Sequence, residues 1–468
     1  MTRSLASRRQ FLQTAAAASA VAGVPYFGWT SPLIAQDAQT KSKNDRPLLG
    51  CIGTGDRWNA VGPQAMNFAD CVAVCDVDSQ HAAKGKAKAL EQNSKKGRQL
   101  DVAVHEDYRK LLDRKDIEVV TIVTPDHWHS KIAIEAMQAG KDVYCEKPLT
   151  LTIDEGKQIV KVLKETGRVF QVGTQQRSEM AAEKGKFPQQ FLTAVALCHA
   201  GRVGKIQQVE CRIGGSPTSG EIPQAAVPSQ LNWDMWLGQA PLTEYLEGPK
   251  GNGGYPPSRT HYEFRWWYEY SGGKMTDWGA HHIDIATWAI GMDNSGPTSV
   301  EGVMAEHPVP FKEGWPTVSN RYNAATKFDV KCMYPNGIEL HILSEGENGI
   351  LIKGDKGELF VSRGALRGSA VDSLQDQPLP AGTISKLYKG KKPGNHMANF
   401  FDCIADRSQP ISDVYTHHRS MTTCHLANIA IRLGKPLKWN PETEQIEGDD
   451  VANGWLKREQ RKGYEVVG

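Results

Sequence analysis

The chain has 468 residues, with 55 Lys and Arg against 53 Asp and Glu, and its formal net charge is +2. Such a balance, without a basic stripe, argues against a nucleic-acid-binding protein. A chain of this length can form two or three domains with a large core and a cleft between them. Nine cysteines without a CxxC pair predict neither a disulfide framework nor a zinc site, so we expect no metal centre. One or two disulfide bridges in an oxidising compartment are the alternative.

The first 35 residues have the features of an export signal. Ser7–Leu12, with its arginine pair, precedes a short apolar run of small residues over 14–24, and a small-residue cleavage site follows at 33–35. We therefore expect a twin-arginine signal peptide over 1–35, a linker over 36–46, and a periplasmic or otherwise exported protein that uses the twin-arginine machinery. A basic tail, or a signal retained as an anchor, is the alternative. No later stretch reaches transmembrane length, so we expect no membrane span in the mature chain.

A dinucleotide-binding pattern opens the mature chain. The apolar run 46–52 predicts a strand, Gly53 and Gly55 a tight turn, and 59–68 a helix. Glycines at this turn let the backbone approach a pyrophosphate that lies on the helix N-terminus. We expect the cofactor-binding residues here to be Gly53, Gly55, Asp56 and Arg57.

The choice between NAD and NADP depends on the next strand, predicted over 71–75. It ends in Asp76, about twenty residues after the turn, where an acidic side chain accepts both ribose hydroxyls of NAD and repels a 2′-phosphate. Arg57 leaves NADP open, because a guanidinium near the ribose tolerates a phosphate. Trp58 occupies the third glycine position of the pattern, which predicts a displaced helix or a wider turn.

Alternating strands and helices continue to about residue 170. We expect helices over 108–112 and 130–139 and buried strands over 119–123 and 142–145. This order is typical of a doubly wound parallel sheet. We assign it to residues 47–170.

Two polar motifs follow the ends of these strands. Thr124, Pro125 and His129 come after one strand, and Glu146 and Lys147 come after the next. Ligands of parallel sheets bind at the carboxyl ends of the strands, so we expect all five residues at the cofactor. A lysine there can hydrogen-bond a substrate hydroxyl beside the nicotinamide. The alternative is an exposed Glu146–Lys147 ion pair.

The second half combines alternating strands with an aromatic segment. Residues 262–270 contain six aromatic rings, including Trp266, which can stack on sugar rings or form core. Period-two alternation predicts strands over 206–213, 337–343, 350–354 and 357–361.

Proton-transfer groups concentrate between Gly272 and Asp284. From Met275 the sequence predicts one helix, on which Asp277 and His281 share a face four residues apart. A carboxylate in that position can orient an imidazole whose pKa lies near neutrality. A buried histidine beside an N-cap aspartate is the alternative.

The end of the chain predicts two amphipathic helices over 395–433, which Gly434 terminates. Residues 441–468 form a C-terminal tail that we expect to be loosely ordered from Gln445 onwards.

These motifs resemble those of the Gfo/Idh/MocA oxidoreductases, a family that includes glucose-fructose oxidoreductase and inositol dehydrogenase. The resemblance rests on Pro125, His129 and the run 139–148, which ends in Glu-Lys-Pro. It implies that Lys147 lies over the nicotinamide at the substrate.

In the inositol dehydrogenase branch an aspartate is followed, four residues later, by the histidine that acts as acid and base. Asp277 and His281 match this pattern, and Asp284 matches a further acidic position. The resemblance therefore gives the segment around Gly272 a role in catalysis.

The same resemblance implies a fold of two α/β domains. An N-terminal Rossmann domain with a doubly wound parallel sheet would be followed, over 171–394, by a domain with a large open, mostly antiparallel sheet. The helices over 395–440 would pack back on the Rossmann domain. The free face of the second sheet often packs against another subunit in this family, so a homodimer or homotetramer is expected.

Motifs and resemblance together predict an oxidoreductase that transfers a hydride between NAD, or less favourably NADP, and a sugar, polyol or sugar derivative. Free NAD is scarce outside the inner membrane, so we expect a tightly held cofactor. The alternatives are an NAD-dependent, redox-neutral glycosidase and a non-enzymatic sensor that binds NAD or sugar. The expected catalytic residues are Lys147, Asp277 and His281, and the expected substrate-binding residues also include Trp266 and His282.

Overall fold

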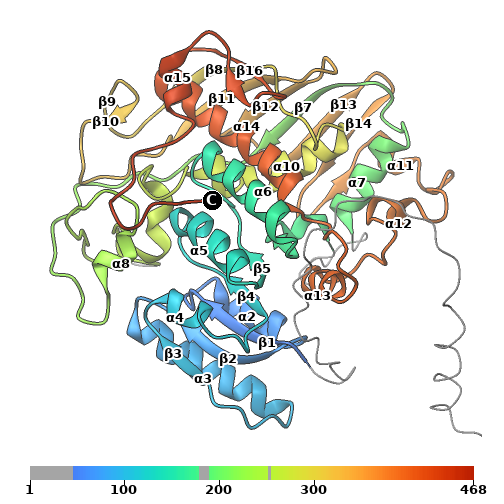
Figure 1. Cartoon of the computed structure of the whole chain (residues 1–468). Coiled ribbons are helices and arrows are strands. Elements are labelled where there is room, and N and C mark those ends of the chain that lie inside the picture. Colours follow the sequence, from blue (N-terminus) through green and yellow to red (C-terminus); the bar gives the residue numbers. More distant parts are fainter. Residues whose placement is uncertain (1–45, 179–188, 251–253) are drawn as a thin grey trace, which may run out of the picture. The chain divides into compact units, whose positions relative to one another are not determined.

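The computed structural model describes residues 46–178, 189–250 and 254–468 (Figure 1). The expected signal peptide, and the linker up to residue 45, lie outside the described residues. Within the described part no helix is both long and apolar enough to cross a membrane. All nine cysteines are buried and unbridged.

The first half forms a six-stranded sheet in which every neighbouring pair is parallel, in the order β3-β2-β1-β4-β5-β6. This confirms the predicted Rossmann-type sheet, with its switch point between β1 and β4. The strands are β1 (Leu48–Ile52), β2 (Asp70–Cys75), β3 (Ala103–His105), β4 (Val119–Ile122), β5 (Asp142–Cys145) and β6 (Phe170–Val172).

The register brings four strand ends to one edge of this sheet. Ile52 lies opposite both Cys75 and Ile122, and Ile122 lies opposite Cys145. The residues that follow these strands are therefore neighbours in space although they are far apart in sequence. They are Gly53, Asp76, Val123 and Glu146.

Helices cover both faces of the parallel sheet. One apolar cluster joins the sheet to α2 (Trp58–Met66), α3 (Ser79–Lys95) and α13 (His396–Asp406). The other cluster joins it to α4 (Tyr108–Leu112), α5 (Asp126–Gln138) and α6 (Ile153–Thr166).

Helix α3 was not predicted, because its buried positions hold small or polar residues rather than large apolar ones. They are Ala82, Gly85, Ala89 and Asn93.

The second half forms a nine-stranded sheet, which confirms the predicted mostly antiparallel architecture. Its order is β15-β14-β13-β7-β12-β11-β8-β16-β17, and only β7 and β12 run parallel. A separate two-stranded ribbon holds β9 (Phe311–Lys312) and β10 (Trp315–Pro316). The nine strands are β7 (Ile206–Arg212), β8 (Ser299–Glu306), β11 (Lys327–Met333), β12 (Glu339–Leu343), β13 (Gly349–Gly354), β14 (Gly357–Val361), β15 (Leu366–Arg367), β16 (Leu437–Asn440) and β17 (Gln445–Ile446).

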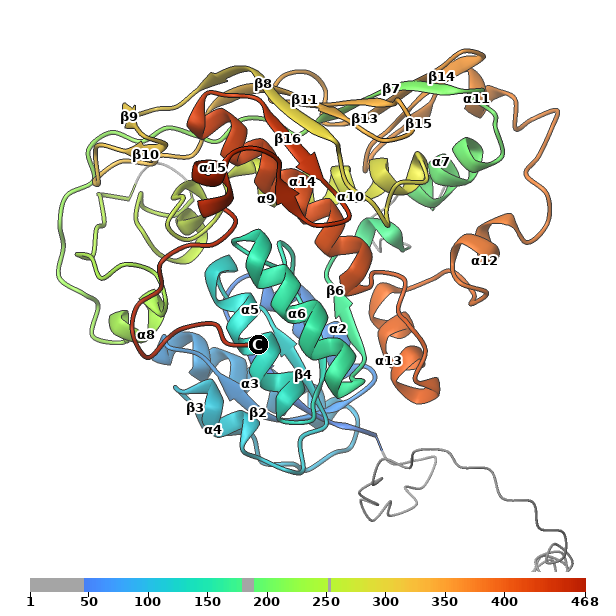
Figure 2. The same ribbon diagram turned by 45° about the horizontal axis from the view of Figure 1, so that its top comes forward.

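Three helices pack on one face of this sheet and form its largest apolar cluster: α7 (Gln190–His199), α10 (Gly279–Ala289) and α14 (Val414–Leu433) (Figure 2). Short elements complete the chain: η1 (Gln175–Arg177), α8 (Trp233–Leu237), η2 (His261–Trp266), α9 (Lys274–Asp277), α11 (Ser369–Asp372), α12 (Thr383–Leu387) and α15 (Asp450–Gly454).

The helix predicted from Met275 is broken into α9 and α10 at Trp278. The carbonyl of Trp278 accepts hydrogen bonds from both His281 N and His282 N, where the ladder restarts. Gly279 follows the break, and a Cβ there would lie 3.1 Å from the Sγ of Cys424 on α14. Close packing against α14 therefore accompanies the interruption.

The C-terminal tail is ordered, contrary to our expectation. It carries β17 and α15, and Arg461 Nε donates to the carbonyl of Gly238 at 2.8 Å. Lys131 on α5 donates to the carbonyl of Glu465, also at 2.8 Å. The prediction was based on the polar sequence of the tail. It was wrong because long-range hydrogen bonds to backbone carbonyls hold the tail in place.

Candidate active site and cofactor cavity

A cavity of about 520 Å³ lies along the carboxyl edge of the parallel sheet, which is within the usual range for cofactor and substrate sites. Both halves of the chain contribute to its walls. Its lining includes Gly53, Gly55, Asp56, Arg57, Asp76, Thr124, Pro125, His129, Glu146 and Lys147 from the first half, and Trp236, His261, Tyr262, Arg265, Asp277 and His281 from the second.

The glycine turn has the geometry that a dinucleotide requires. Gly53 leaves β1 with φ +78°, and its N–H donates to the carbonyl of Cys75 at 2.8 Å. A Cβ at Gly53 would lie 2.5 Å from the carbonyl oxygen of Val123, so no other residue fits. Gly55 follows and α2 begins at Trp58, which leaves a backbone cradle before a helix N-terminus. These residues fit a bound pyrophosphate.

Trp58 is accommodated by a second glycine in its own helix. Its side chain is fully buried, and a Cβ on Gly62 would lie 2.3 Å from the indole Cε2. Because Gly62, one turn later, has no side chain, there is space for the indole of Trp58, the residue at the third glycine position of the pattern. The spacing of Trp58 and Gly62 was visible in the sequence and could have indicated this solution.

Asp76 lies where a cofactor ribose would be recognised. One of its carboxylate oxygens accepts the Thr54 N–H at 2.7 Å and the other accepts the Asp78 N–H at 2.9 Å. Burial raises its pKa, and the nearby His81 acts in the opposite direction. Arg57 forms its ion pair with Glu146 instead of Asp76, and its Nη2 lies 3.1 Å from Glu146 Oε1.

Asp78, His81 and His261 bring three possible ligand atoms within 4.8 Å of one another beside Asp76. They are the residues of the described chain that could hold a metal ion. Our expectation that the chain has no metal centre remains a prediction.

Lys147 and Asp277 form a largely buried ion pair in the lining of the cavity. Nζ of Lys147 lies 2.6 Å from Oδ1 of Asp277, and it also donates to the Asp277 carbonyl at 3.0 Å. The two side chains are only 13% and 14% exposed. Burial acts to raise the pKa of Asp277, but the charges of Lys147 and Arg265 outweigh it and lower the pKa to about 2.

His281 lines the same part of the cavity but is not oriented by Asp277. No hydrogen bond joins the two among the described residues, because the break at Trp278 separates them and Asp277 is bound to Lys147. His281 Nδ1 is buried without a hydrogen-bond partner in the described chain. Burial, followed by the charges of Lys147 and Arg363, lowers the pKa of His281 well below its usual value. The imidazole is therefore neutral at pH 7.

Glu146 and His129 hold the loops behind Lys147. Glu146 is buried and accepts from Arg57 at 3.1 Å and from Gln175 at 2.8 Å, so Glu146 and Lys147 are not the exposed pair of the alternative prediction. The two ring nitrogens of His129 lie 2.7 Å from the Pro148 carbonyl and 2.9 Å from that of Thr124. His129 thereby ties the loop after β4 to the loop after β5, where the Lys147–Pro148 peptide is cis.

Two expected substrate-binding residues lie outside the cavity lining. The imidazole of His282 is buried between Gln176 at 3.4 Å and Asn348 at 3.1 Å. The indole of Trp266 donates to Glu263 at 2.9 Å. Their neighbours in sequence, His281 and Arg265, line the cavity instead. Sequence periodicity and composition could not show which of two adjacent residues faces the cavity.

Asp126 is a cavity residue to which the sequence analysis gave no role. It begins α5 directly after Pro125, it is 4% exposed, and Ser271 Oγ donates to its Oδ2 at 2.5 Å. Burial raises its pKa to about 7, although Arg265 acts to lower it. Its position after the end of β4 was the signal that could have identified it.

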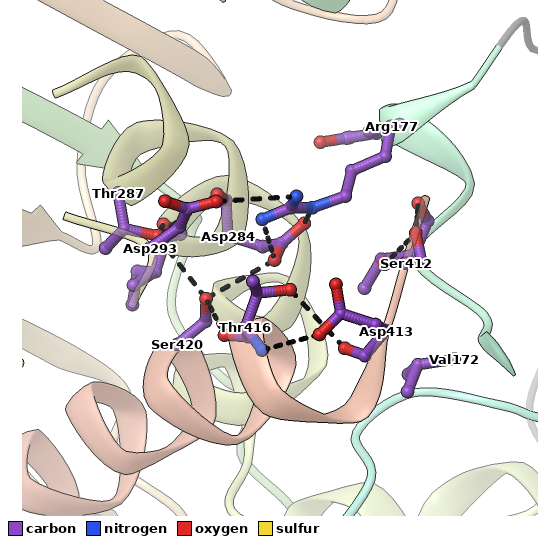
Figure 3. Close-up of polar contacts among 12 residues, drawn as sticks. Val172, Arg177, Asp284, Thr287, Asp293, Ser412, Asp413, Thr416 and Ser420 are labelled. Atoms are coloured by element: carbon purple, nitrogen blue, oxygen red, sulfur yellow. Dashed lines mark hydrogen bonds and ion pairs between the residues drawn. The ribbon is translucent and has the colours of Figure 1, made fainter. Parts of the chain in front are cut away.

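Asp284, the further acidic position of the family pattern, lies outside the cavity lining. Arg177 binds it through Nε at 2.6 Å and Nη2 at 2.9 Å, and both side chains are buried (Figure 3). Ser420 Oγ donates to the same carboxylate at 3.3 Å, and the guanidinium stacks 4.5 Å above Trp288. This pair fixes α10, which carries His281, to η1 after the last strand of the parallel sheet.

A loop from the second half is held against the cavity near Asp76. Ser79 N donates to the carbonyl of Gln230 and Asn232 N donates to that of Val77, both at 2.9 Å. Leu231, between them, forms an isolated antiparallel bridge with Asp78 and lines the cavity.

Comparison with known proteins gives relatives over part of the chain. The chain is 29% identical over 244 residues to a glycosyl hydrolase family 109 protein of Shewanella putrefaciens (strain CN-32 / ATCC BAA-453). The alignment covers 49% of this chain and 47% of that protein. A family 109 protein of Shewanella baltica (strain OS185) is 28% identical over 245 residues, with the same coverage. The chain thus spans about half the length of the curated relatives that it matches.

Solved structures share the fold at low sequence identity. The WlbA dehydrogenase of Chromobacterium violaceum, in complex with NADH and UDP-GlcNAcA, has a TM-score of 0.55 at 16% identity and covers 85% of this chain and 97% of its own. A levoglucosan dehydrogenase in complex with NADH has a TM-score of 0.53 at 19% identity, covering 84% and 98%. An aldose-aldose oxidoreductase of Caulobacter crescentus, complexed with glycerol, has a TM-score of 0.54 at 16% identity, covering 84% and 100%.

Family models match both halves of the chain. The NAD-binding Rossmann fold of the oxidoreductase family matches residues 49–174, and the C-terminal alpha/beta domain of the same family matches residues 217–466. The second match alone covers more than half of the 468 residues. The chain therefore belongs to the Gfo/Idh/MocA oxidoreductase family.

Proposed function

We propose that this chain is an NAD-dependent oxidoreductase that transfers a hydride between the nicotinamide and a CH–OH group of a sugar, a polyol or a sugar derivative. The observation that carries the proposal is the largely buried Lys147–Asp277 pair, which lines one cavity together with His281 and the glycine turn of a dinucleotide-binding sheet. The names of the solved neighbours, which include sugar dehydrogenases, support the substrate class.

The cofactor would be held by the first half of the chain. The turn at Gly53 and Gly55 would take the pyrophosphate, and Asp76 would accept the ribose hydroxyls, which favours NAD over NADP. When bound, the nicotinamide supplies the hydride acceptor or donor.

Lys147 and His281 would act on the substrate oxygen. Asp277 holds Nζ of Lys147 by two contacts, which leaves the remaining ammonium hydrogen free to be donated to the oxygen that becomes a carbonyl. The low pKa of Asp277 keeps it charged, so its role is to position Lys147. His281 is neutral and can accept a hydrogen bond from the substrate hydroxyl.

The loop held against the cavity near Asp76 supports a cofactor that stays bound between turnovers. The backbone hydrogen bonds from Ser79 to Gln230 and from Asn232 to Val77 hold this loop in place beside the cavity. The N-terminal sequence supports export through the twin-arginine machinery, and an exported enzyme of this type needs a retained cofactor. We include periplasmic location in the proposal.

A redox-neutral, NAD-dependent glycosidase is the second candidate, because the curated relatives are glycosyl hydrolase family 109 proteins. Such an enzyme would oxidise a sugar hydroxyl transiently and restore the hydride after the glycosidic bond breaks. A panel of aryl glycosides separates the candidates. Release of the phenol without net NADH supports the glycosidase, whereas accumulation of NADH or a paired-sugar requirement supports the oxidoreductase.

The first test is the acid-denatured supernatant of purified protein, analysed for NAD and NADH by mass spectrometry and absorbance. Lys147→Met and His281→Ala are then expected to lower turnover by at least about a hundredfold while bound cofactor persists, because each variant removes a positioned hydrogen-bond partner of the reacting oxygen. Lys274→Met is the matched control, because Lys274 is 4.0 Å from Asp277 but outside the cavity lining. Unchanged turnover in Lys147→Met and His281→Ala would refute the proposed function.

A further inference from the structure

We infer that Asp126 is a further catalytic residue of this cavity: its carboxylate accepts the proton of the substrate hydroxyl and returns it in the reverse reaction. This inference rests on the proposed oxidoreductase function and adds the proton acceptor that the predicted Asp277–His281 pair was expected to supply.

Asp126 lies in the lining of the cavity that holds the proposed reacting groups. It follows Pro125 at the carboxyl edge of the parallel sheet and lines the cavity together with Lys147, Asp277 and His281. Its carboxylate is fixed by the Ser271 hydroxyl at 2.5 Å, and Ser271 is itself fully buried. A proton acceptor must be held in a fixed position in the cavity where the substrate reacts.

The other two carboxylates at this end of the cavity are bound to cations. Asp277 pairs with Lys147 at 2.6 Å, and Glu146 pairs with Arg57 at 3.1 Å. Protonating Asp277 would break an ion pair whose side chains are 13% and 14% exposed, and protonating Glu146 would break the ion pair of a carboxylate that is itself 4% exposed. Both changes are costly. The hydrogen bond to Asp126 comes from a neutral hydroxyl, so Asp126 can change its protonation state without leaving a buried cation unpaired.

The charges around Asp126 favour the same conclusion. Burial raises its pKa to about 7, Arg265 and Lys147 act to lower it, and the Asp277 carboxylate acts to raise it. His281 is a weak proton acceptor by comparison, because its pKa lies well below 6.5. An acid or base works best when its pKa is near the pH of the reaction.

The resulting proton transfer is balanced. In the oxidation the substrate O–H bond breaks, a new O–H bond forms on Asp126, and the carbon–hydrogen bonding pair leaves as hydride to the oxidised nicotinamide. Lys147 keeps its three hydrogens and donates one hydrogen bond to the substrate oxygen throughout. In the reduction Asp126 returns its proton to the oxygen of the new alcohol.

The test compares Asp126→Asn, Asp126→Glu and Ser271→Ala in the protein with its co-purified cofactor. Asp126→Asn is expected to lower the rate of nicotinamide reduction by about a hundredfold and to remove the acid limb of the pH profile. Asp126→Glu is expected to restore part of the rate and the acid limb. Ser271→Ala is expected to move that limb upward by about one pH unit, because the lost hydroxyl stabilised the charged carboxylate.

A second readout does not depend on turnover. Infrared difference spectra of the resting protein, wild type minus Asp126→Asn, are expected to show a carboxylic acid band that disappears as the pH rises through about 7. Cofactor content of each variant reports whether the cavity has formed.

Two results would overturn the inference. One is an acid limb that persists in Asp126→Asn, and the other is an Asp126 carboxyl that stays ionised down to about pH 5 in the infrared titration. Failure of the proposed function looks different: wild-type protein would reduce no bound nicotinamide with any sugar, while the infrared titration of Asp126 would still be measurable.

Discussion

Replacing Arg177 with methionine tests how strongly one buried ion pair stabilises the fold and the active site. The guanidinium is 2% exposed and its partner Asp284 is 1% exposed, and two hydrogen bonds join them (Figure 3). Methionine preserves much of the packing on Trp288 but removes the charge. We expect the free energy of unfolding to fall by about 3–5 kcal/mol near pH 8, the usual cost of leaving a buried charge unpaired.

The loss should depend on pH with a defined sign. Without Arg177, the buried Asp284 carboxylate keeps the Ser420 hydroxyl at 3.3 Å as a hydrogen-bond donor but has lost its counter-charge. Protonation of this carboxylate in the folded state removes the unpaired buried charge. The deficit relative to wild type should therefore be largest where the carboxylate is ionised and should shrink as the pH falls.

Urea unfolding followed by tryptophan fluorescence, at several pH values, measures this deficit. Arg177→Met/Asp284→Asn should recover most of the loss, because the fully buried charge of Asp284 is removed as well, whereas Asp293, 3.9 Å from Arg177, is 17% exposed. Arg367→Met is the matched control: it also removes a two-bonded arginine pair, with Glu347, but these side chains are 53% and 55% exposed. It should change the free energy by about 1 kcal/mol or less. An Arg177→Met deficit no larger than this control, or one that grows as the pH falls, would refute the reasoning.

Three further predictions concern the cofactor end of the cavity. Gly53→Ala should lower the NAD affinity measured by calorimetry at least about tenfold, because the added Cβ would lie 2.5 Å from the carbonyl oxygen of Val123. Gly97→Ala is the control, since Gly97 has a similar φ of +71° but no atom near the added Cβ. It should destabilise the fold by about 1–2 kcal/mol of backbone strain and leave NAD binding unchanged. Asp76→Ala should weaken NAD binding and narrow its preference over NADP, which competitive titration measures; an unchanged ratio would contradict the ribose assignment. Trp58→Ala should cost about 3–5 kcal/mol in urea unfolding, because it empties a fully buried site.

The parallel sheet and its binding edge could be predicted because they depend on local pattern. Short apolar runs ending in glycine, Asp76, Thr124 or Glu146 specify strands, and parallel pairing then brings their carboxyl ends together. The same reasoning placed Lys147 at this edge, where the structure has it. Helix α3 was not predicted from the sequence, because an amphipathic helix is recognised by large apolar residues at helical spacing. The buried side of α3 holds small residues such as Ala82 and Ala89 instead.

The hydrogen-bond partner of Asp277 could not be predicted from the sequence. The four-residue spacing shows that His281 is near Asp277 on a helix, but it does not show whether a distant lysine binds the carboxylate instead. Asp277 and His281 were expected to bind each other across one turn. The helix is interrupted at Trp278, and Lys147, 130 residues away in sequence, takes the carboxylate at 2.6 Å. An ammonium outcompetes a neutral imidazole for a buried carboxylate, because burying an unpaired charge costs more than leaving an imidazole nitrogen unpartnered. This exchange of partners leaves Asp277 permanently charged, and the proton-transfer role that the sequence pattern assigned to the pair then passes, by our inference, to Asp126.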